Sequence, residues 1–360
     1  MKQQTAFSLE SVSFLIQALC FGALAVLLLL FPKQVSLGVT QGLQLCFSSL
    51  IGSILPFLVV SKLFLLRGLQ RVLTRRSLFF MRRVLRLPDV CNAVFVFSMI
   101  GGYPVGASMA TDLWKDGSIT RKQAQRLLLF CVGPGPSFAV SAVGAGMLGS
   151  AKAGAVLYAS VVAGAVLTGI IARLCFGKQT DAATAEPPQV QPLPPAESVD
   201  RAVRESVQTM VLICGFVALF GGLLALLQAS GLPQQMLPFA AAVLEVTNAC
   251  RLLSPFMPLP VLALAVAWGG VCTHCQLSPF LGALELPFWK FSLFRAVHAG
   301  CSFLCCRALL TVVRLPAGAM MQSAVRPAVQ HSYLLSFCMC MMCALLLVGS
   351  RCSIRLGRTK

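Results

Sequence analysis

"MIGGYPVGASMATDLWKDG", which spans Met99–Gly117, interrupts an apolar run that would otherwise form a membrane helix. Two glycines end the run, and a proline follows them directly after Tyr103. A residue that precedes proline is pushed toward an extended conformation, whereas proline itself suits the first turn of a helix. The stretch therefore predicts that one helix ends near Gly101 and that a half-helix starts at Pro104.

A helix that stops inside a bilayer leaves backbone N–H and C=O groups that need partners. The break at Gly101 must therefore lie within a helix bundle or line a hydrated cavity. The N-terminus of the half-helix would present free N–H groups and a partial positive charge to that cavity. These properties predict a solute site, and kinks that only permit tight helix crossings are the alternative.

The composition places the chain in the membrane. Hydrophobic residues make up 57% of the 360 positions and charged residues 11%, against about 25% charged residues in soluble globular proteins. The mean hydropathy is +0.83, and the apolar residues fall in blocks of about 20, enough to cross a bilayer core. The sequence predicts an all-α polytopic membrane protein with about eight membrane segments in two halves, some of them broken or re-entrant.

The distribution of basic residues accounts for the net charge of +18 without a nucleic-acid partner. Seven arginines lie in Arg67–Arg86, and a basic tail follows Ser350. Such clusters are typical of the cytoplasmic flanks of membrane helices. We expect Arg67–Arg86 to form an interfacial helix on the anionic headgroups of the lipid bilayer, with a solvated basic loop as the alternative. The protein is then a multi-pass protein of the cell membrane, with both termini in the cytoplasm.

The same patterns divide the chain into five regions. A proline-rich, polar linker at residues 178–203 separates a first membrane half, residues 43–177, from a second half, residues 204–315. An N-terminal membrane helix and loop precede them at residues 1–42. A C-terminal membrane helix and the basic tail follow at residues 316–360. The linker has no apolar period, so we expect it to be extended in part.

Further interruptions occur in both halves. Each half contains an apolar run that breaks at a pair of glycines, Gly101-Gly102 in the first half and Gly269-Gly270 in the second, and "GPGPS" at Gly133–Ser137 breaks the first half again. Interrupted segments at corresponding places in two halves indicate a transporter site. Because basic residues flank it on both sides, we expect Val90–Thr111 to be a re-entrant hairpin with both ends in the cytoplasm. A spanning segment is the alternative.

Few polar residues lie inside the apolar segments of the second half. Glu245 and Asn248 are three residues apart and share a helix face, as do Arg295 and His298. Intramembrane charges usually find partners, so an ion pair between Glu245 and Arg295 is one explanation. Proton coupling through Glu245 or His298 is the other.

The candidate solute-binding residues are the small, aromatic and polar residues at or near the breaks: Gly101, Gly102, Tyr103, Pro104, Gly106, Gly135, Ser137, Glu245, Asn248, Gly269, Gly270, His274 and Gln276. "CTHC" at Cys272–Cys275 contains metal-ligand residue types but has no second pair at zinc-site spacing, so it predicts no metal. We find no nucleophile–base pair, phosphate loop or HExxH motif. We therefore expect no catalytic residues, no enzyme activity and no cofactor.

The motifs also resemble a known family, the sporulation integral membrane proteins of endospore-forming Firmicutes typified by YlbJ. The resemblance extends in order over about residues 40–315. It rests on Gly102–Ala107, Asp112, Gly117, Ile119, Ala124, Arg126–Leu128, Pro136, Phe138, Val143-Gly144, Leu244-Glu245, Thr247-Asn248, Gly269-Gly270, His274–Gln276, Arg295 and His298. It implies a role in spore formation. It also implies the nucleoside-recognition, or Gate, domain found in nucleoside transporters and ferrous-iron permeases, without implying that nucleosides are the substrate.

Two functions follow from these observations. The first is a transporter-like membrane protein of sporulation that moves or senses a small polar solute at the broken segments. The second is a membrane scaffold or assembly factor whose breaks only permit packing. Convergence of Glu245, Asn248, His274 and Arg295 on the breaks would favour the first. The sequence leaves open the identity of the solute, the coupling ion and a homo-oligomeric state.

Overall fold

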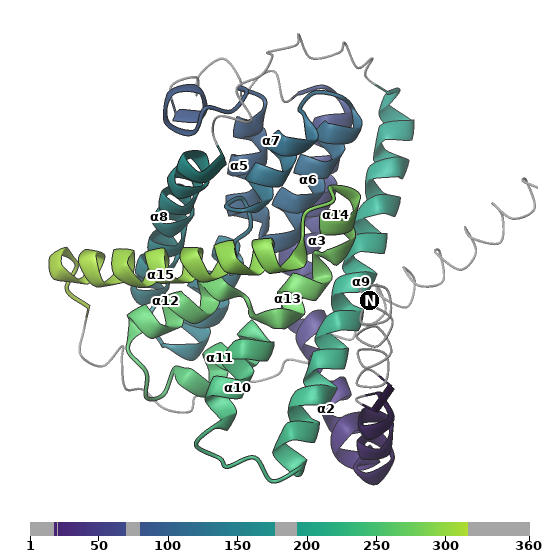
Figure 1. Cartoon of the computed structure of the whole chain (residues 1–360), viewed down its shortest axis with the longest axis vertical. Coiled ribbons are helices and arrows are strands. Elements are labelled where there is room, and N and C mark those ends of the chain that lie inside the picture. Colours follow the sequence, from purple (N-terminus) through teal and green to yellow (C-terminus); the bar gives the residue numbers. More distant parts are fainter. Residues whose placement is uncertain (1–17, 20, 70–79, 177–192, 316–360) are drawn as a thin grey trace, which may run out of the picture.

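The computed structural model describes residues 18–19, 21–69, 80–176 and 193–315, and every regular element in these ranges is helical. Four helices are long and apolar enough to cross a membrane, and a fifth span results if the bent pair Phe21–Leu30 and Pro32–Ser48 counts as one. Shorter apolar helices lie between them (Figure 1). The predicted all-α polytopic membrane fold is therefore confirmed.

The chain enters the described bundle through α2 (Pro32–Leu45), the π-helical turn η1 (Cys46–Leu50) and α3 (Ile51–Leu66). Residues 70–79 lie outside the described residues, so the interfacial helix expected at Arg67–Arg86 stays a prediction; a π-helical segment, η2 (Phe80–Leu85), follows them.

The opening stretch of the sequence forms a helical hairpin. Helix α5 (Cys91–Gly101) ends at Gly102, whose φ of +92° favours glycine, and α6 (Tyr103–Lys115) begins directly after it with Pro104 in its first turn. The two helices pack side by side (Figure 1). A Cβ on Gly106 would lie 2.5 Å from the Cβ of Ser98, so the hairpin closes tightly only because Gly106 has no side chain.

An interrupted helix follows the hairpin. Helix α7 (Arg121–Leu128) is started by a capping box between Thr120 and Gln123, and it gives way to irregular backbone over residues 129–135. The π-helix η3 (Ser137–Met147) starts after Pro136, and α8 (Ala151–Phe176) completes the first half. The break at "GPGPS" is therefore where the sequence predicts it.

The second half repeats this order of elements. It consists of a long helix, two short helices around a break at Glu245, an interrupted pair around Gly269, a short connecting helix and a long final helix. These are α9 (Pro195–Ala229), α10 (Leu237–Leu244), α11 (Val246–Leu253), α12 (Leu259–Trp268), α13 (Gly270–Gln276), α14 (Ser278–Ala283) and α15 (Phe288–Val312). Helix α9 packs on α3, and α15 packs on α8, so long helices of the two halves pair with each other.

The repeated order corrects the predicted correspondence between the halves. The hairpin α5–α6, which turns at Gly102, matches the pair α10–α11, which turns at Glu245. The break at Gly269-Gly270 instead matches the interruption before Pro136. A glycine joins the two breaks of each half. A Cβ on Gly135 would lie 2.7 Å from the carbonyl oxygen of Ile100, and one on Gly270 would lie 2.8 Å from that of Leu244.

The linker prediction is corrected at its C-terminal end. Helix α9 begins at Pro195, inside the linker expected at residues 178–203, whereas residues 177–192 lie outside the described residues. Ion pairs four residues apart, Asp200–Arg204 and Arg201–Glu205, stabilise this polar start of the helix, and proline suits its first turn. The C-terminal helix expected at residues 316–360 also lies outside the described residues.

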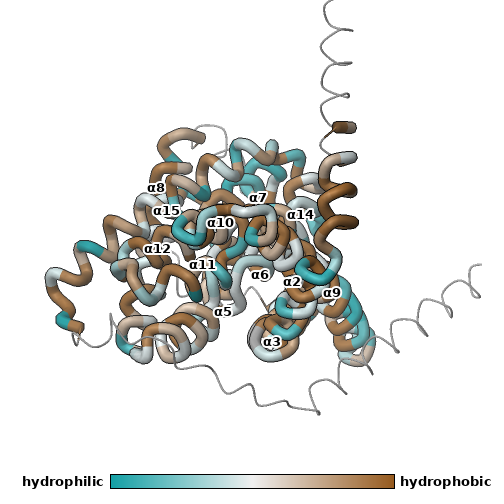
Figure 2. The backbone as a smooth tube through the Cα atoms, turned by 90° about the horizontal axis from the view of Figure 1, so that it is seen from below, coloured by the Kyte–Doolittle hydropathy of each residue, from teal (hydrophilic) through white to brown (hydrophobic). Residues whose placement is uncertain are grey.

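The outer surface of the bundle suits a lipid environment. Figure 2 shows hydrophobic residues along most of the helices. Large apolar side chains such as Leu174, Leu219 and Leu304 are exposed, although the interior is itself mainly apolar. Apolar exposure on this scale is expected where acyl chains replace water as the solvent. The helices therefore contact the lipid bilayer.

Candidate functional site

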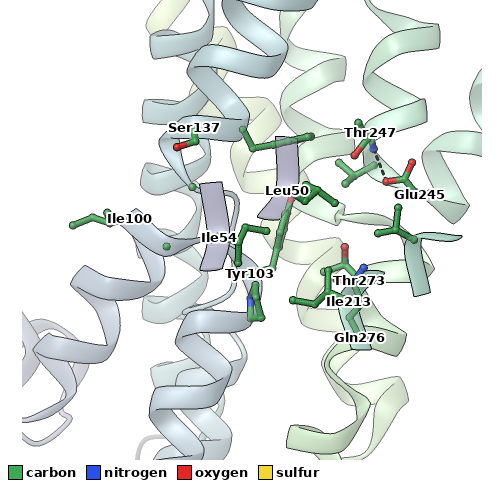
Figure 3. Close-up of a pocket in the computed structure, with 17 residues that line it drawn as sticks. Leu50, Ile54, Ile100, Tyr103, Ser137, Ile213, Glu245, Thr247, Thr273 and Gln276 are labelled. Carbon is green, nitrogen blue, oxygen red and sulfur yellow. Dashed lines mark hydrogen bonds between the residues drawn. The ribbon is translucent and has the colours of Figure 1, made fainter. Parts of the chain in front are cut away.

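The breaks of both halves meet around one small cavity (Figure 3). Its volume is about 50 Å³, which is room for a few water molecules. Polar atoms and breaks from both halves line it, and apolar side chains of η1, α3 and α9 close it. The lining residues are Leu50, Ile54, Ile100, Gly101, Gly102, Tyr103, Pro104, Gly135, Ser137, Phe138, Ile213, Val217, Glu245, Val246, Thr247, Thr273 and Gln276. We call this space the central cavity.

Three helices begin at the central cavity. Helix α6 starts after Gly102, η3 starts after Pro136, and α11 starts after Glu245. The N-terminus of a helix carries unpaired N–H groups and a partial positive charge. Their convergence directs the positive ends of three helix dipoles toward one cavity, whose lining is otherwise mainly apolar.

Glu245 supplies the negative charge at these helix ends. Its Oε1 accepts a hydrogen bond from the Thr247 N–H at 2.8 Å, and its Oε2 accepts from the Asn248 N–H at 2.8 Å and from Asn248 Nδ2 at 2.9 Å. The side chain is buried. Glu245 thus caps α11, and the charge-assisted bonds with the helix dipole compensate its burial.

Tyr103 ties the hairpin of the first half to the second half. Its hydroxyl donates to the carbonyl of Val266 in α12 at 2.7 Å, and its ring lies 3.3 Å from the position of a Cβ on Gly269. The residue after the first break therefore holds the helix that leads into the last break.

Arg295 in α15 joins the interrupted helices of both halves. Its guanidinium donates to the carbonyls of Val132, Ala267 and Trp268, the last at 3.5 Å. Val132 belongs to the irregular stretch before Pro136, whereas the other two carbonyls end α12. A buried positive charge at the carbonyl end of a helix is favourable because the helix dipole is negative there.

His298 completes this arrangement as a neutral imidazole. Its Nδ1 lies 2.9 Å from Arg295 Nη1, and its Nε2 lies 2.9 Å from the carbonyl oxygen of Val161 in α8. Arginine can only donate, so Nδ1 accepts and Nε2 carries the proton donated to Val161. Both ring nitrogens of His298 are therefore occupied by structural bonds.

The predicted ion pair between Glu245 and Arg295 is not formed. In the described part of the chain, the carboxylate bonds only to the start of α11, and the guanidinium bonds to carbonyls and to His298. The physical reason is that broken helices supply partial charges of both signs inside the bundle. Each charged side chain is therefore stabilised by the partial charge of a helix end. The sequence had suggested an oppositely charged side chain as the partner.

His274 lies beside the Gly269 break but does not line the central cavity. Its Nδ1 is 2.7 Å from the carbonyl oxygen of Gly270, and its ring packs against Trp268, Phe288 and Phe291. Its buried Nε2 has no hydrogen-bond partner among the described residues. The residue is enclosed by aromatic rings.

The structure brings together eight of the thirteen predicted solute-binding residues. Those that line the central cavity are Gly101, Gly102, Tyr103, Pro104, Gly135, Ser137, Glu245 and Gln276. The others lie behind its wall or beside it: Gly106, which packs against the carbonyl of Cys131, Asn248, which lines a neighbouring cavity, and Gly269, Gly270 and His274. Glu245, Asn248, His274 and Arg295 all contact residues at or beside a break, but only Glu245 of the four lines the central cavity.

Two polar residues and the apolar wall of the central cavity were not predicted from the sequence. Thr247 lies between Glu245 and Asn248, and Thr273 lies inside "CTHC", so both stood within motifs already singled out. Ile54 and Ile213 come from α3 and α9, and nothing in their local sequence distinguishes them from other apolar residues of membrane helices. In the described part of the chain, no group of three His, Cys, Asp or Glu residues could hold a metal ion.

Comparison with known proteins gives one relative. No family model and no solved structure match the chain. The sporulation integral membrane protein YlbJ of Bacillus subtilis (strain 168) is 24% identical to it over 333 residues, and the match covers 81% of each chain. A match of this extent includes both membrane halves. The chain is therefore a multi-pass membrane protein that is similar over most of its length to the sporulation integral membrane protein YlbJ.

Proposed function

We propose that this protein acts in spore formation and that it moves or senses a small polar solute at the central cavity. The name of its relative YlbJ supports the cellular process. The molecular activity rests on one observation: helix N-termini from both halves and the carboxylate of Glu245 line the same cavity. In membrane transporters, sites of this kind lie where discontinuous helices of two repeats meet.

The chemistry of the central cavity favours a polar ligand. The side chains of Thr247, Gln276 and Glu245 offer hydrogen-bond donors and acceptors, and the positive ends of the α6 and η3 dipoles favour an electronegative group. A volume of about 50 Å³ is far smaller than the pockets of roughly 300–1,000 Å³ that enclose drug-sized ligands. A solute larger than a few water molecules therefore requires the walls to move apart. We retain the Gate-type architecture as part of the proposal, without nucleosides as the solute.

The test combines a cellular and a purified assay. The chain is expressed in Bacillus subtilis that lacks YlbJ, and heat-resistant spores are counted for the wild type and for Glu245→Gln. Glu245→Gln keeps the shape of the side chain but removes the charge that caps α11. Because the charge-assisted hydrogen bonds to α11 are then lost, we expect the spore yield to fall by about tenfold or more. Glu197→Gln, on the exposed first turn of α9, is the matched control and should leave the yield unchanged.

Uptake in proteoliposomes then tests the solute itself. A panel of labelled small polar solutes is offered to vesicles with wild-type protein, with Glu245→Gln and without protein. The proposal is supported if vesicles with the wild-type protein take up a solute and vesicles with Glu245→Gln do not. Equal flux in all three preparations across the panel contradicts movement of those solutes, and equal spore counts for Glu245→Gln and Glu197→Gln contradict a role for the central cavity.

The scaffold is the second candidate, and Arg295 is the observation that favours it. The hydrogen bonds of its guanidinium join α15 to the interrupted helices of both halves, and the side chain lies outside the central cavity. A scaffold requires the breaks for packing alone. It predicts full spore yield from Glu245→Gln as long as the variant protein accumulates to wild-type levels.

A further inference from the structure

A buried ionic cluster joins three helices that also form the wall of the central cavity. Lys62 of α3 lies 2.5 Å from Asp112 of α6 and 2.9 Å from Glu205 of α9, measured from Nζ to the nearest carboxylate oxygen. The Lys62 side chain is only 8% exposed. Arg201 holds the other oxygen of Glu205 at 2.9 Å. We call Lys62, Asp112 and Glu205 the charge clamp.

On each of the three helices, the clamp residue is separated from a cavity-lining residue by the same number of positions. Each helix places a cavity-lining residue eight positions away from its clamp residue: Ile54 and Lys62, Pro104 and Asp112, Ile213 and Glu205. Eight residues of α-helix rise about 12 Å, and positions seven to eight apart share a helix face. In α9 the clamp residue precedes the lining residue, so the clamp lies on the side of the cavity that faces Pro195 (Figure 1).

One layer of side chains separates the clamp from the cavity. Midway along the three helices are Leu58, Ser108 and Thr209. Leu58 and Ser108 are buried, and the Ser108 hydroxyl has no hydrogen-bond partner among the described residues. Thr209 bonds to the carbonyl of Glu205. A buried hydroxyl without a hydrogen-bond partner among the described residues thus lies between the two levels along α6.

On the side away from the clamp, the central cavity adjoins a larger cavity. Thr247 lines both the central cavity and a second cavity of about 470 Å³ between α2, α9 and α11. That cavity shares Gln41 and Gln228 with a third of about 280 Å³ near the C-terminal end of α9. Amide side chains recur along this route, at Gln34, Gln41, Gln44, Gln228 and Asn248.

We propose that the charge clamp is a gate that closes the central cavity toward the Pro195 end of α9, while the amide-lined cavities give access from the opposite end. Lys62 holds two carboxylates of neighbouring helices together, and without it they repel each other in a partly buried site. Separation of α3, α6 and α9 at this level opens the cavity on the clamp side. The gate rests on the proposed function, because a sided gate is useful only to a protein that admits a solute.

The test measures from which side the central cavity can be reached. Ile54→Cys places a thiol in its wall, and a charged thiol reagent that does not cross membranes is added to right-side-out or inside-out vesicles. Modification of the peptide that contains position 54 is read by mass spectrometry, which separates it from the native cysteines. We expect modification only from the side of the amide-lined cavities in the otherwise unchanged chain. With Lys62→Met added, modification from the clamp side should rise about tenfold or more, because the repelling carboxylates shift the population toward the open state.

Controls separate the gate from a general loss of structure. Lys122→Met removes an exposed lysine of α7 and should leave the sidedness unchanged. The exchange variant Lys62→Asp with Asp112→Lys restores opposite charges and should close the clamp side again. If Lys62→Met does not accumulate, Asp112→Asn combined with Glu205→Gln removes both partners of Lys62 and takes its place.

Two outcomes overturn the gate. One is modification of position 54 from the clamp side in the chain with the intact clamp. The other is unchanged one-sided modification in every variant that breaks the clamp. The labelling experiment needs no solute, so its result holds even if no solute of the panel is taken up. The uptake result likewise holds even if the labelling contradicts the gate.

Discussion

At the scale of single residues, helix ends take the role that oppositely charged side chains usually have inside a membrane. Glu245 caps the start of α11, and Arg295 holds the carbonyls that end α12 and precede η3. Each charged side chain therefore stabilises a helix break and does not bind the other charged side chain. Arg295 has the larger structural role, since it bonds to both halves and to His298.

Removal of Arg295 should destabilise the protein strongly. Arg295→Met leaves the carbonyls of Val132 and Ala267 without their donor, and each buried unsatisfied group costs about 1–3 kcal/mol. We expect a clearly lower midpoint of thermal unfolding in detergent. Arg295→Lys should be intermediate because an ammonium cannot reach several carbonyls with a planar fork. Arg307→Met, at an exposed position of the same helix, should leave the midpoint within error of the wild type, and an equal midpoint for Arg295→Met would contradict this role.

At the scale of elements, each half consists of a tight pair of short helices that packs against an interrupted helix. Glycines permit these contacts, since Gly135 and Gly270 bring the backbones of two breaks together. The hairpin α5–α6 depends in the same way on Gly106, where a Cβ would lie against both the Cys131 carbonyl and Ser98. Packing of this kind is specified by the absence of side chains.

Gly106→Ala should therefore disturb the hairpin. The added methyl group meets backbone on one side, which cannot move as the end of a flexible side chain can, and overpacking of this kind costs typically about 1–3 kcal/mol. Gly215→Ala in α9 is the control: no atom lies within 4 Å of its Cβ position, and alanine favours a helix by up to about 1 kcal/mol. Unfolding in detergent measures both variants. A stabilised Gly106→Ala would show that the hairpin is looser than the structure describes.

At the scale of the whole molecule, the two halves follow the same order of elements and meet at the central cavity. The charge clamp brings the C-terminal part of α6 beside the first turns of α9. The turn between α6 and α7 must then lie on the same side of the membrane as Pro195, whereas the turn between α9 and α10 lies at the opposite end of α9.

Labelling of single cysteines checks this arrangement. Ser118→Cys lies in the turn after α6, and Gln235→Cys lies in the turn before α10. The basic flanks predict that the first is modified from the cytoplasm, and the length of α9 places the second outside. Site-resolved modification in sealed vesicles measures both. Labelling of Ser118→Cys only from outside would refute a hairpin whose ends face the cytoplasm.

The sequence by itself determined the membrane class and three of the breaks. Apolar blocks of bilayer length require helices, and glycine and proline interrupt them at Gly102, Pro136 and Gly269. The motifs at these breaks are local as well, and eight of the thirteen candidate residues found in and near them line the cavity. These features depend on neighbours in the chain and can be derived from it.

Only the tertiary structure decided the fourth break, the partners of the charges and the clamp. The segment around Glu245 contains neither glycine nor proline, and its helix ends there because the carboxylate caps α11 while Gly270 packs against Leu244. Lys62, Asp112 and Glu205 are separated by 50 and 93 positions in the chain and meet only when α3, α6 and α9 pack. Pairing over such distances depends on which helices become neighbours, and no local pattern of side chains encodes that choice.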